Sequence, residues 1–220
     1  WEPNNELEYY TANNLGNARV EKGRLVIEAK VESMGGREFT SARLNSRNAW
    51  TYGLFECRAR LPKGKDLWPA IWLSPQNNTF GTWPNSGEID IMEYSGQVID
   101  TIAGTIHYKG VGDVINVSKG SGNIKFNTDF SAAYHIFGLK WDKYNITWLL
   151  DGKPFHSEYI NTYLSSPNST TSFYQQKGEP FNMAFHWIVN IAVGGNYFPT
   201  NIYGPQVTPA EGLMWEKPTM

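Results

Sequence analysis

The sequence has a single cysteine, no long apolar run and no excess of positive charge, and each of these absences argues against a class of protein. The lone Cys57 rules out an internal disulfide framework. No apolar run approaches the roughly 18 residues that a membrane-spanning helix needs, so we expect no membrane partner. The net charge of -2 comes with scattered lysines and arginines rather than a basic stripe, so we expect no nucleic-acid partner.

What the sequence has in abundance is aromatic side chains. There are nine tryptophans, twelve tyrosines and eleven phenylalanines in a chain of 220 residues that is only 18% charged. Aromatic rings stabilise hydrophobic cores, but sugar rings also stack on tryptophan, so the composition leaves a core and a carbohydrate cleft both open. The length suits one domain, and we expect residues 1–220 to form it.

Four Asn-x-Ser/Thr sequons bear on the compartment. They begin at Asn77, Asn116, Asn145 and Asn168. Such acceptors matter only on exposed segments in the secretory pathway, and no leader pattern begins at the first residue. We therefore expect a secreted, extracellular protein whose leader has been removed.

Alternation of apolar and polar residues predicts many short strands. Arg24–Glu32 and Gly53–Leu61 both have period 2, and the second places Cys57 in its apolar row as a small buried hydrophobe. Further strands are predicted at Leu67–Leu73, Glu88–Tyr94, Ala103–Tyr108, Ile136–Trp141, Ile146–Leu150 and Met183–Val193.

The segments between these strands favour an all-β sandwich. Asp151-Gly152 separates two predicted strands and is typical of a hairpin turn. No segment has a long stripe of period 3.6, and short strands at this spacing indicate a sandwich. Tyr163–Pro180, rich in Ser, Thr, Asn and Gln, is predicted to be a surface loop, either a wall of a binding cleft or an idle insertion.

One predicted strand carries three carboxylates within six residues, Glu88, Asp90 and Glu93. Burying several acids without cations raises their pKa values and destabilises a fold, so this arrangement needs an explanation. One alternative is an edge strand whose acids face water. The other is an active site.

Strand geometry favours the active site only if the strand is irregular. Glu88 and Asp90 share a face, whereas Glu93 would point the other way on a regular strand. A β-bulge at Ile91–Met92 would return Glu93 to that face and leave Ile89 facing the core. Retaining glycosidases need two carboxyl groups roughly 5–5.5 Å apart, one as nucleophile and one as acid/base. The spacing alone does not decide which glutamate has which role.

These residues resemble a known family. The segment from Trp83 to Glu93, WPNSGEIDIME, is similar to the signature of glycoside hydrolase family 16 in the form with the extra bulge residue, which laminarinase-type enzymes have. Other segments resemble the endo-β-1,3-glucanase branch of that family in order and spacing: Asn5–Thr11, Ser41–Asn45, Lys63–Pro75, Asp129–Asp142 and Asn190–Gly195.

The resemblance implies a fold and an activity. The expected fold is a β-jelly-roll sandwich of two antiparallel sheets with a concave substrate cleft. The expected activity is retaining endo-hydrolysis of a laminarin-like β-1,3-glucan, with mixed-linkage β-1,3-1,4-glucan as a second possible substrate. The alternative is a non-catalytic β-glucan recognition protein, in which the active-site acids have decayed.

The resemblance also implies roles for individual residues. Glu88 matches the nucleophile, Asp90 the assisting acid and Glu93 the acid/base. Matches in the surrounding cleft are Trp83, which stacks on a sugar; Trp68 and Trp72, which line the cleft unless they pack in the core; His107, beside a catalytic carboxyl; and Asn45 and Arg43, which reach sugar hydroxyls.

The sequence departs from the family at both ends. Relatives carry a further strand before the region of Trp1 and another after the region of Met220, and those strands contribute to a calcium site on the convex side of many relatives. We therefore expect a catalytic domain that lacks its terminal strands, requires no cofactor, has at most a doubtful structural calcium ion and is a monomer.

Overall fold

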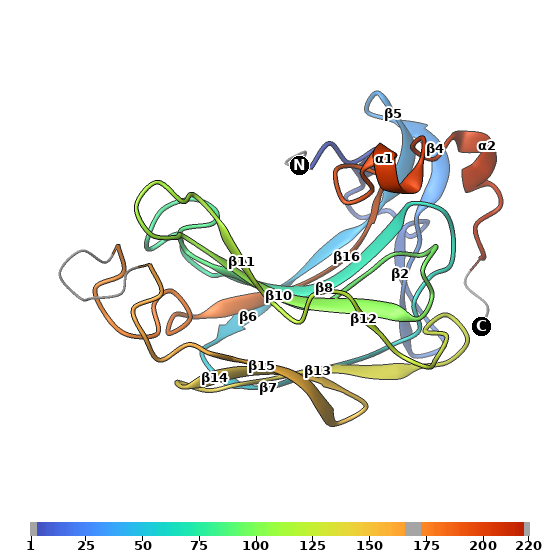
Figure 1. Cartoon of the computed structure of the whole chain (residues 1–220). Helices are drawn as coiled ribbons and strands as arrows, with labels where there is room; N and C mark the ends of the chain where they lie inside the picture. The colour runs from blue at the N-terminus through green and yellow to red at the C-terminus, as the bar shows by residue number, and fades with distance from the viewer. Residues whose placement is uncertain (1–3, 166–172, 218–220) are drawn as a thin grey trace.

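The computed structural model describes residues 4–165 and 173–217, and the described chain is built from β-strands with two one-turn helices. Figure 1 shows two sheets packed face to face. The predicted all-β sandwich is therefore confirmed.

The larger sheet is antiparallel and curved. Figure 1 shows its two ends bending away from the smaller sheet, so that its outer face is concave. Across the sheet the order is β11 (Val117–Gly120), β10 (Thr101–Tyr108), β9 (Glu88–Tyr94), β8 (Leu67–Pro75), β16 (Phe185–Val193) and β6 (Arg43–Trp50), with β12 (Ile124–Lys125) also pairing with β10.

The smaller sheet forms the other layer. Its order is β15 (Lys153–Tyr159), β14 (Asn145–Leu150), β13 (His135–Trp141) and β7 (Gly53–Ala59). The predicted hairpin joins β14 to β15. Asp151 and Gly152 have φ values of 50° and 75°, and two successive positive φ values suit the two-residue turns that match strand twist.

Short elements lie at one end of the larger sheet. β1 (Glu8–Tyr10) pairs in parallel with β5 (Arg37–Ser41), which also pairs with β4 (Lys30–Met34); β2 (Ala18–Glu21) and β3 (Arg24–Ile27) form a separate hairpin; and α1 (Thr200–Tyr203) and α2 (Pro209–Gly212) follow β16.

The prediction of one strand over Arg24–Glu32 was wrong. The segment breaks at Glu28–Ala29 into β3, which pairs with β2, and β4, which pairs with β5. The backbone N–H of Glu28 donates to the carbonyl of Asn17 at the break, 2.8 Å away. Each half thus belongs to a different sheet, a choice made by partners distant in sequence.

The core lies between the two sheets and is rich in aromatic rings. Trp141 and Trp148 from the smaller sheet meet Ile89, Met92 and other apolar side chains of the larger one. The half-buried Cys57 packs against the same cluster, and burial raises the pKa of its thiol, which disfavours the reactive thiolate. Cys57 thus lies in the apolar row, as predicted, but it is half-buried rather than fully buried.

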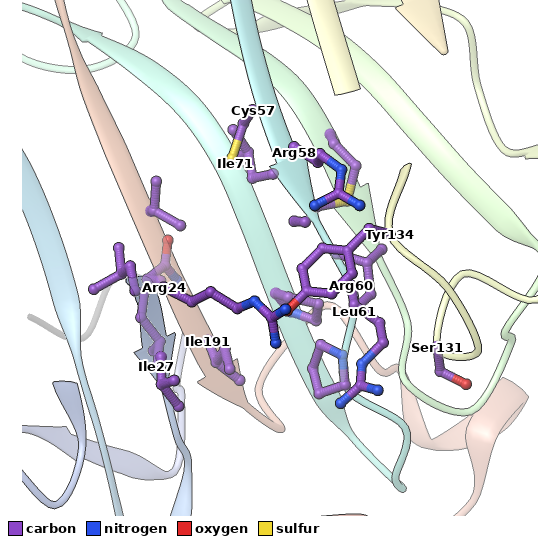
Figure 2. A pocket seen from close by; sticks show the side chains of 18 of the residues that line it. Arg24, Ile27, Cys57, Arg58, Arg60, Leu61, Ile71, Ser131, Tyr134 and Ile191 are labelled. Carbon is purple, nitrogen blue, oxygen red and sulfur yellow. The ribbon is translucent and has the colours of Figure 1, made fainter. Parts of the chain in front are cut away.

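A cavity of about 490 Å³ lies beside β7, on the core side of the larger sheet. Figure 2 shows Arg24 and Arg58 directed at Tyr134, whose ring centroid is 5.5 and 4.5 Å from the two guanidinium carbons, with Ile71 and Ile191 among the apolar residues nearby. Within residues 4–165 and 173–217, β7 pairs only with β13. None of the predicted site residues lines this cavity.

The segment Tyr163–Pro180 is not simply a surface loop. Residues 166–172, with the Asn168 sequon, lie outside the described residues, but Tyr174 is fully buried. Its hydroxyl donates to the carbonyl of Asn85 at 2.8 Å and accepts from the backbone N–H of Lys109 at 3.0 Å. This part of the segment therefore ties the loop before β9 to the end of β10.

In the part of the chain that the structure describes, no helix is long and apolar enough to cross a membrane.

Candidate active site

The bulge predicted in the carboxylate strand is present. Asp90 lies opposite Thr105 of β10 and Glu93 opposite Ala103, so three residues along β9 match two along β10. The pairing with β8 contains the same extra residue. The extra residue is Ile91, because Met92 keeps its partner in β8.

The bulge places the acids on one face. Ile89, Ile91 and Met92 are all at most 2% exposed and belong to the core between the sheets. Two successive side chains therefore enter the core at the bulge, and Glu93 returns to the side of Glu88 and Asp90. That side is the concave face of the larger sheet.

His107 lies against the first two acids. It is paired with Glu88 across the ladder, and its Nε2 lies 3.2 Å from Oδ2 of Asp90 and 3.8 Å from Oε1 of Glu88. Oγ of Ser118 on β11 lies 3.0 Å from the other ring nitrogen, Nδ1. Ser118 thus supports the ring orientation that turns Nε2 toward the carboxyl groups.

Trp83 contacts both partners of this pair. It lies in the loop before β9 and is 54% exposed. Its ring centroid is 5.8 Å from that of His107, and its side chain acts to lower the pKa of the Glu88 carboxyl, against the effect of burial. The resemblance implies that this ring stacks on a sugar, and its exposure leaves that prediction open.

Glu93 has a different partner. Nε1 of Trp68 donates to its Oε1 at 3.2 Å. The Trp68 ring is stacked on Tyr197, with centroids 4.3 Å apart and planes 10° from parallel. Trp68 therefore contacts the carboxylate strand β9 from the concave face rather than packing in the core, and one of its ring faces is already covered.

Trp72 is held in a second polar cluster on the concave face. Its Nε1 donates to Oδ1 of Asn190 at 2.8 Å, and the Arg43 guanidinium lies 4.7 Å from its ring centroid. Nδ2 of Asn190 donates in turn to the Tyr10 hydroxyl at 3.0 Å. Trp72 is half-buried, so it lines the concave face, as the resemblance implies.

Strand register places Arg43 and Asn45 at one end of this surface. Arg43 is opposite Asn190, and Asn45 is opposite Ile188, both on β16. Arg43 is half-buried and Asn45 exposed. The fold thus brings all nine predicted site residues to the concave face or its margin.

Burial dominates the electrostatics of the three acids. It raises the pKa of Asp90 to about 8 and that of Glu93 to about 8, and the neighbouring Asp90 adds to the effect on Glu93. Burial, and then Asp90, also raise the pKa of Glu88 well above its ordinary value, while His107 opposes this shift. Like charges this close do not all ionise at neutral pH.

The three carboxyl groups lie close enough to titrate as a cluster rather than one by one. His107 and Trp83 favour the charged form of Glu88, and Trp68 favours the charged form of Glu93. Each glutamate therefore has its own neighbours that oppose the effect of burial on its pKa.

The ligand atoms of Glu88, Asp90 and His107 lie within 4.8 Å of one another, which raises the question of a metal. Among the described residues no other group of this kind occurs. The set does not suit calcium, because Ca²⁺ takes six to eight oxygen ligands and one of these three is an imidazole nitrogen.

Sequence reasoning missed several residues of this surface: Tyr10, Ser118, Asn190 and Tyr197. Asn190 and Tyr10 lie within segments used for the family resemblance, but only the pairing of β16 with β8 shows that Asn190 meets Trp72. Tyr197 follows β16 in a turn, and no pattern in the sequence predicts its stack on Trp68.

A family profile agrees with the geometry. The profile described as glycosyl hydrolases family 16 matches residues 5–179. The chain belongs to glycoside hydrolase family 16. The large curved sheet with acids on its concave face is therefore the family 16 sheet, and the resemblance drawn from the carboxylate strand is confirmed.

Individual proteins are similar over nearly the whole chain. The glucan endo-1,3-beta-glucosidase of Cryptopygus antarcticus is 46% identical over 98% of this chain and 78% of its own length. The crystal structure of the laminarinase from Rhodothermus marinus has a TM-score of 0.79 at 38% identity, covering 94% of this chain and 80% of that one.

A third relative was crystallised with an oligosaccharide. It is a mutant of a non-specific endo-β-1,3(4)-glucanase co-crystallised with 1,3-β-D-cellotriosyl-glucose, with a TM-score of 0.77 at 34% identity over 95% of this chain and 77% of that one.

Proposed function

We propose that this family 16 protein is a retaining endo-β-1,3-glucanase that cleaves laminarin-like glucan, with Glu88 as nucleophile and Glu93 as acid/base. The observation that carries the proposal is the bulge at Ile91, which sets both glutamates on one concave face beside a half-buried set of tryptophans. Similarity to endo-1,3-β-glucanases over 94–98% of the chain supports the substrate class.

In the first step the Glu88 carboxylate attacks the anomeric carbon while Glu93 gives its proton to the departing glycosidic oxygen. A C–O bond to Glu88 forms as the bond to the leaving sugar breaks. Asp90, protonated because of its raised pKa, and His107 hold Glu88 in place. The raised pKa of Glu93 keeps its proton available near neutral pH.

In the second step Glu93, now a carboxylate, takes a proton from water, and the water oxygen attacks the anomeric carbon. Glu88 leaves as a carboxylate, so the product keeps the anomeric configuration of the substrate. The indole N–H of Trp68 stabilises the charged form of Glu93 between the two steps.

The test is hydrolysis of laminarin followed by reducing-sugar release and by NMR of the first-formed anomer. We expect the parent to release β-configured ends and Glu88→Ala to lose about 10⁴-fold or more of the rate, because it lacks the group that forms the covalent bond. Inactivity of the parent on both laminarin and barley glucan would refute the proposal that the protein is a β-glucanase.

A non-catalytic β-glucan recognition protein is the rival from another class. Decay of the active site would remove acids, whereas Glu88, Asp90 and Glu93 are all present. Binding of laminarin by both parent and Glu88→Ala without any product would favour the rival.

Linkage preference is the finer part of the proposal. Mixed-linkage β-1,3-1,4-glucan is a secondary substrate in our proposal, and the third relative is named a β-1,3(4)-glucanase. A product profile from laminarin and from barley glucan separates the two preferences, since only cleavage of barley glucan yields fragments that contain β-1,4 bonds.

Both steps use protein carboxyl groups and water, so we propose that catalysis requires no cofactor. We also propose that the protein acts as a monomer. EDTA should leave the laminarin rate unchanged, and light scattering should give a mass near the 24.9 kDa of the chain. A loss of rate that calcium restores, or a dimer mass, would contradict these points.

We also propose secretion, from the sequons. Asn77 is exposed in the turn after β8, whereas Asn116 and Asn145 are half-buried. Expression in a eukaryotic secretory host should give a mass shift that an endoglycosidase removes and that Asn77→Gln reduces. If the product is unglycosylated, the sequons give no support to the proposal of secretion.

A further inference from the structure

The bulge that positions Glu93 is contacted by a residue of the opposite sheet. Nε1 of Trp148, on β14, donates to the backbone carbonyl of Asp90 at 2.7 Å. Asp90 is the last residue before the extra residue Ile91. The hydrogen bond thus reaches the backbone at the point where β9 leaves regular pairing.

Trp148 is well placed to hold that point still. Its side chain is 0% exposed and packs in the core between the sheets. A carbonyl turned out of the ladder into an apolar core would lose about 1–3 kcal/mol if it found no donor. The indole N–H supplies that donor without bringing a flexible polar side chain into the core.

Gly104 gives independent evidence that the fold makes room for this contact. On β10, Gly104 lies between Ala103 and Thr105, the residues opposite Glu93 and Asp90, so it faces the bulge. A Cβ atom there would lie 2.2 Å from Cδ1 and 2.3 Å from Nε1 of Trp148. The absence of a side chain at Gly104 leaves room for the Trp148 ring, because any side chain there would displace the indole from the Asp90 carbonyl.

From these two observations we propose that Trp148, admitted by Gly104, is a positioning residue for catalysis. It fixes the bulge and so the placement of Glu93 relative to Glu88, without touching substrate. The inference rests on the proposed roles of the two glutamates. A misplacement of about 1 Å in a catalytic group can cost about 10²-fold in rate.

The test compares Trp148→Phe with Trp141→Phe. Trp141 is the matched control because it is 1% exposed, lies in the same sheet and donates through Nε1 to a backbone carbonyl, that of Phe181, at 3.1 Å. Both variants lose one buried indole N–H. Only Trp148→Phe loses a contact with the catalytic strand.

The readout is dependence on the leaving group. On laminarin, whose leaving oxygen needs a proton from Glu93, we expect Trp148→Phe to lose about tenfold or more in kcat/KM with KM nearly unchanged. On 2,4-dinitrophenyl β-laminaribioside, whose leaving group needs no proton, the loss should be under about threefold. Azide, which attacks without a base, should restore the second step.

Glu93→Ala supplies the reference for this signature and separates the two proposals. If Glu93→Ala lacks the leaving-group dependence, the assigned role of Glu93 fails. If Glu93→Ala shows it but Trp148→Phe matches Trp141→Phe on both substrates, only the inference about Trp148 fails. An equal loss on both substrates for Trp148→Phe would also overturn it.

Gly104→Ala is an independent route, and it suffices by itself if Trp148→Phe does not fold. We expect it to reproduce the leaving-group dependence. Where both single variants fold, the double variant should lose less than the product of the two single losses, because both act on one contact. Near-UV circular dichroism establishes folding for each variant. Wild-type leaving-group behaviour in a folded Gly104→Ala protein would count against the proposal.

Discussion

At the scale of single residues, the two glutamates that we propose to be catalytic differ in the groups that face them. Glu93 receives an indole N–H from Trp68, whereas Glu88 lies near His107 and has its pKa lowered by the neighbouring Trp83. Each of these contacts favours the charged carboxylate. The neighbours therefore set how far burial raises each pKa.

Trp68 offers a test of this balance through the pH profile. In the proposed mechanism, activity requires protonated Glu93, so we expect it to fall as pH rises through that group's pKa of about 8. The Trp68 bond lowers this pKa, so Trp68→Phe should move the basic limb of kcat/KM on laminarin to higher pH.

Trp72→Phe is the matched control for that experiment. Its indole donates to Asn190 instead of to an acid, so its basic limb should stay at the parent position. Equal displacement of the limb in both variants would show that the Trp68 bond does not control Glu93.

Trp83 combines an exposed ring with an effect on the pKa of Glu88, and its two contributions can be separated. Trp83→Phe keeps a ring for stacking and should lower kcat more than it raises KM. Trp83→Ala should also raise KM, by about tenfold, since stacking on an aromatic ring contributes about 1 kcal/mol or more. Steady-state kinetics on laminarin measures both, and an unchanged KM for Trp83→Ala would remove Trp83 from substrate binding.

At the scale of the strand, the bulge accommodates the extra residue Ile91 and so keeps Glu93 on the same face as Glu88 and Asp90. Without Ile91, β9 would read Glu-Ile-Asp-Met-Glu, in which regular alternation already puts all three acids on one face. We therefore expect deletion of Ile91 to keep measurable laminarin hydrolysis. The deletion removes a side chain that is 2% exposed and should cost about 2–5 kcal/mol in the free energy of unfolding.

Deletion of Ile89 is the control, because it removes the same residue type from the same strand. The deletion makes Glu88 and Asp90 direct neighbours, so that alternation turns the Glu88 side chain toward the core. Laminarin hydrolysis should then be lost. Urea unfolding and reducing-sugar release measure the two variants. Complete inactivity of a folded Ile91 deletion would mean that the bulge contributes more than the facing of Glu93.

At the scale of the whole molecule, buried acids couple stability to pH. Burial raises the pKa of Glu8 to about 7, and those of Asp90 and Glu93 to about 8. Their values in an unfolded chain are near 4, so between pH 4 and 8 the folded protein binds more protons than the unfolded chain. The free energy of unfolding must fall as pH rises through this window.

Calorimetry should therefore give a Tm that is several °C lower at pH 8.5 than at pH 5.5, at about 1.4 kcal/mol per unit of pKa shift. Glu8→Gln, which keeps an acceptor for the backbone N–H of Val193, should flatten this dependence. Glu211→Gln is the control, because the pKa of Glu211 is lowered to about 2 by Lys65 and Thr208 and lies outside the window. A Tm that rises from pH 5.5 to 8.5 would contradict the assignment of these shifts.

The local parts of the structure could be predicted from the sequence. The predicted strand at Glu88–Tyr94 has the same bounds as β9 in the structure, and Asp151-Gly152 predicted the hairpin between β14 and β15. The odd spacing of Glu93 required the bulge near Met92 if the three acids were to share a face. These features depend on side-chain alternation and on backbone preferences of neighbouring residues, which are written along the chain.

Contacts between distant segments were decided only by the tertiary structure. The split of Arg24–Glu32, the burial of Tyr174 and the stack of Tyr197 on Trp68 each depend on a partner far away in the sequence. The same holds for the reach of Trp148 from the opposite sheet to the Asp90 carbonyl. The sequence by itself determined the strand that carries the three acids and showed that they share a face only if that strand has a bulge. The tertiary structure decided which groups surround them, because burial and hydrogen-bond donors come from strands that only folding brings together.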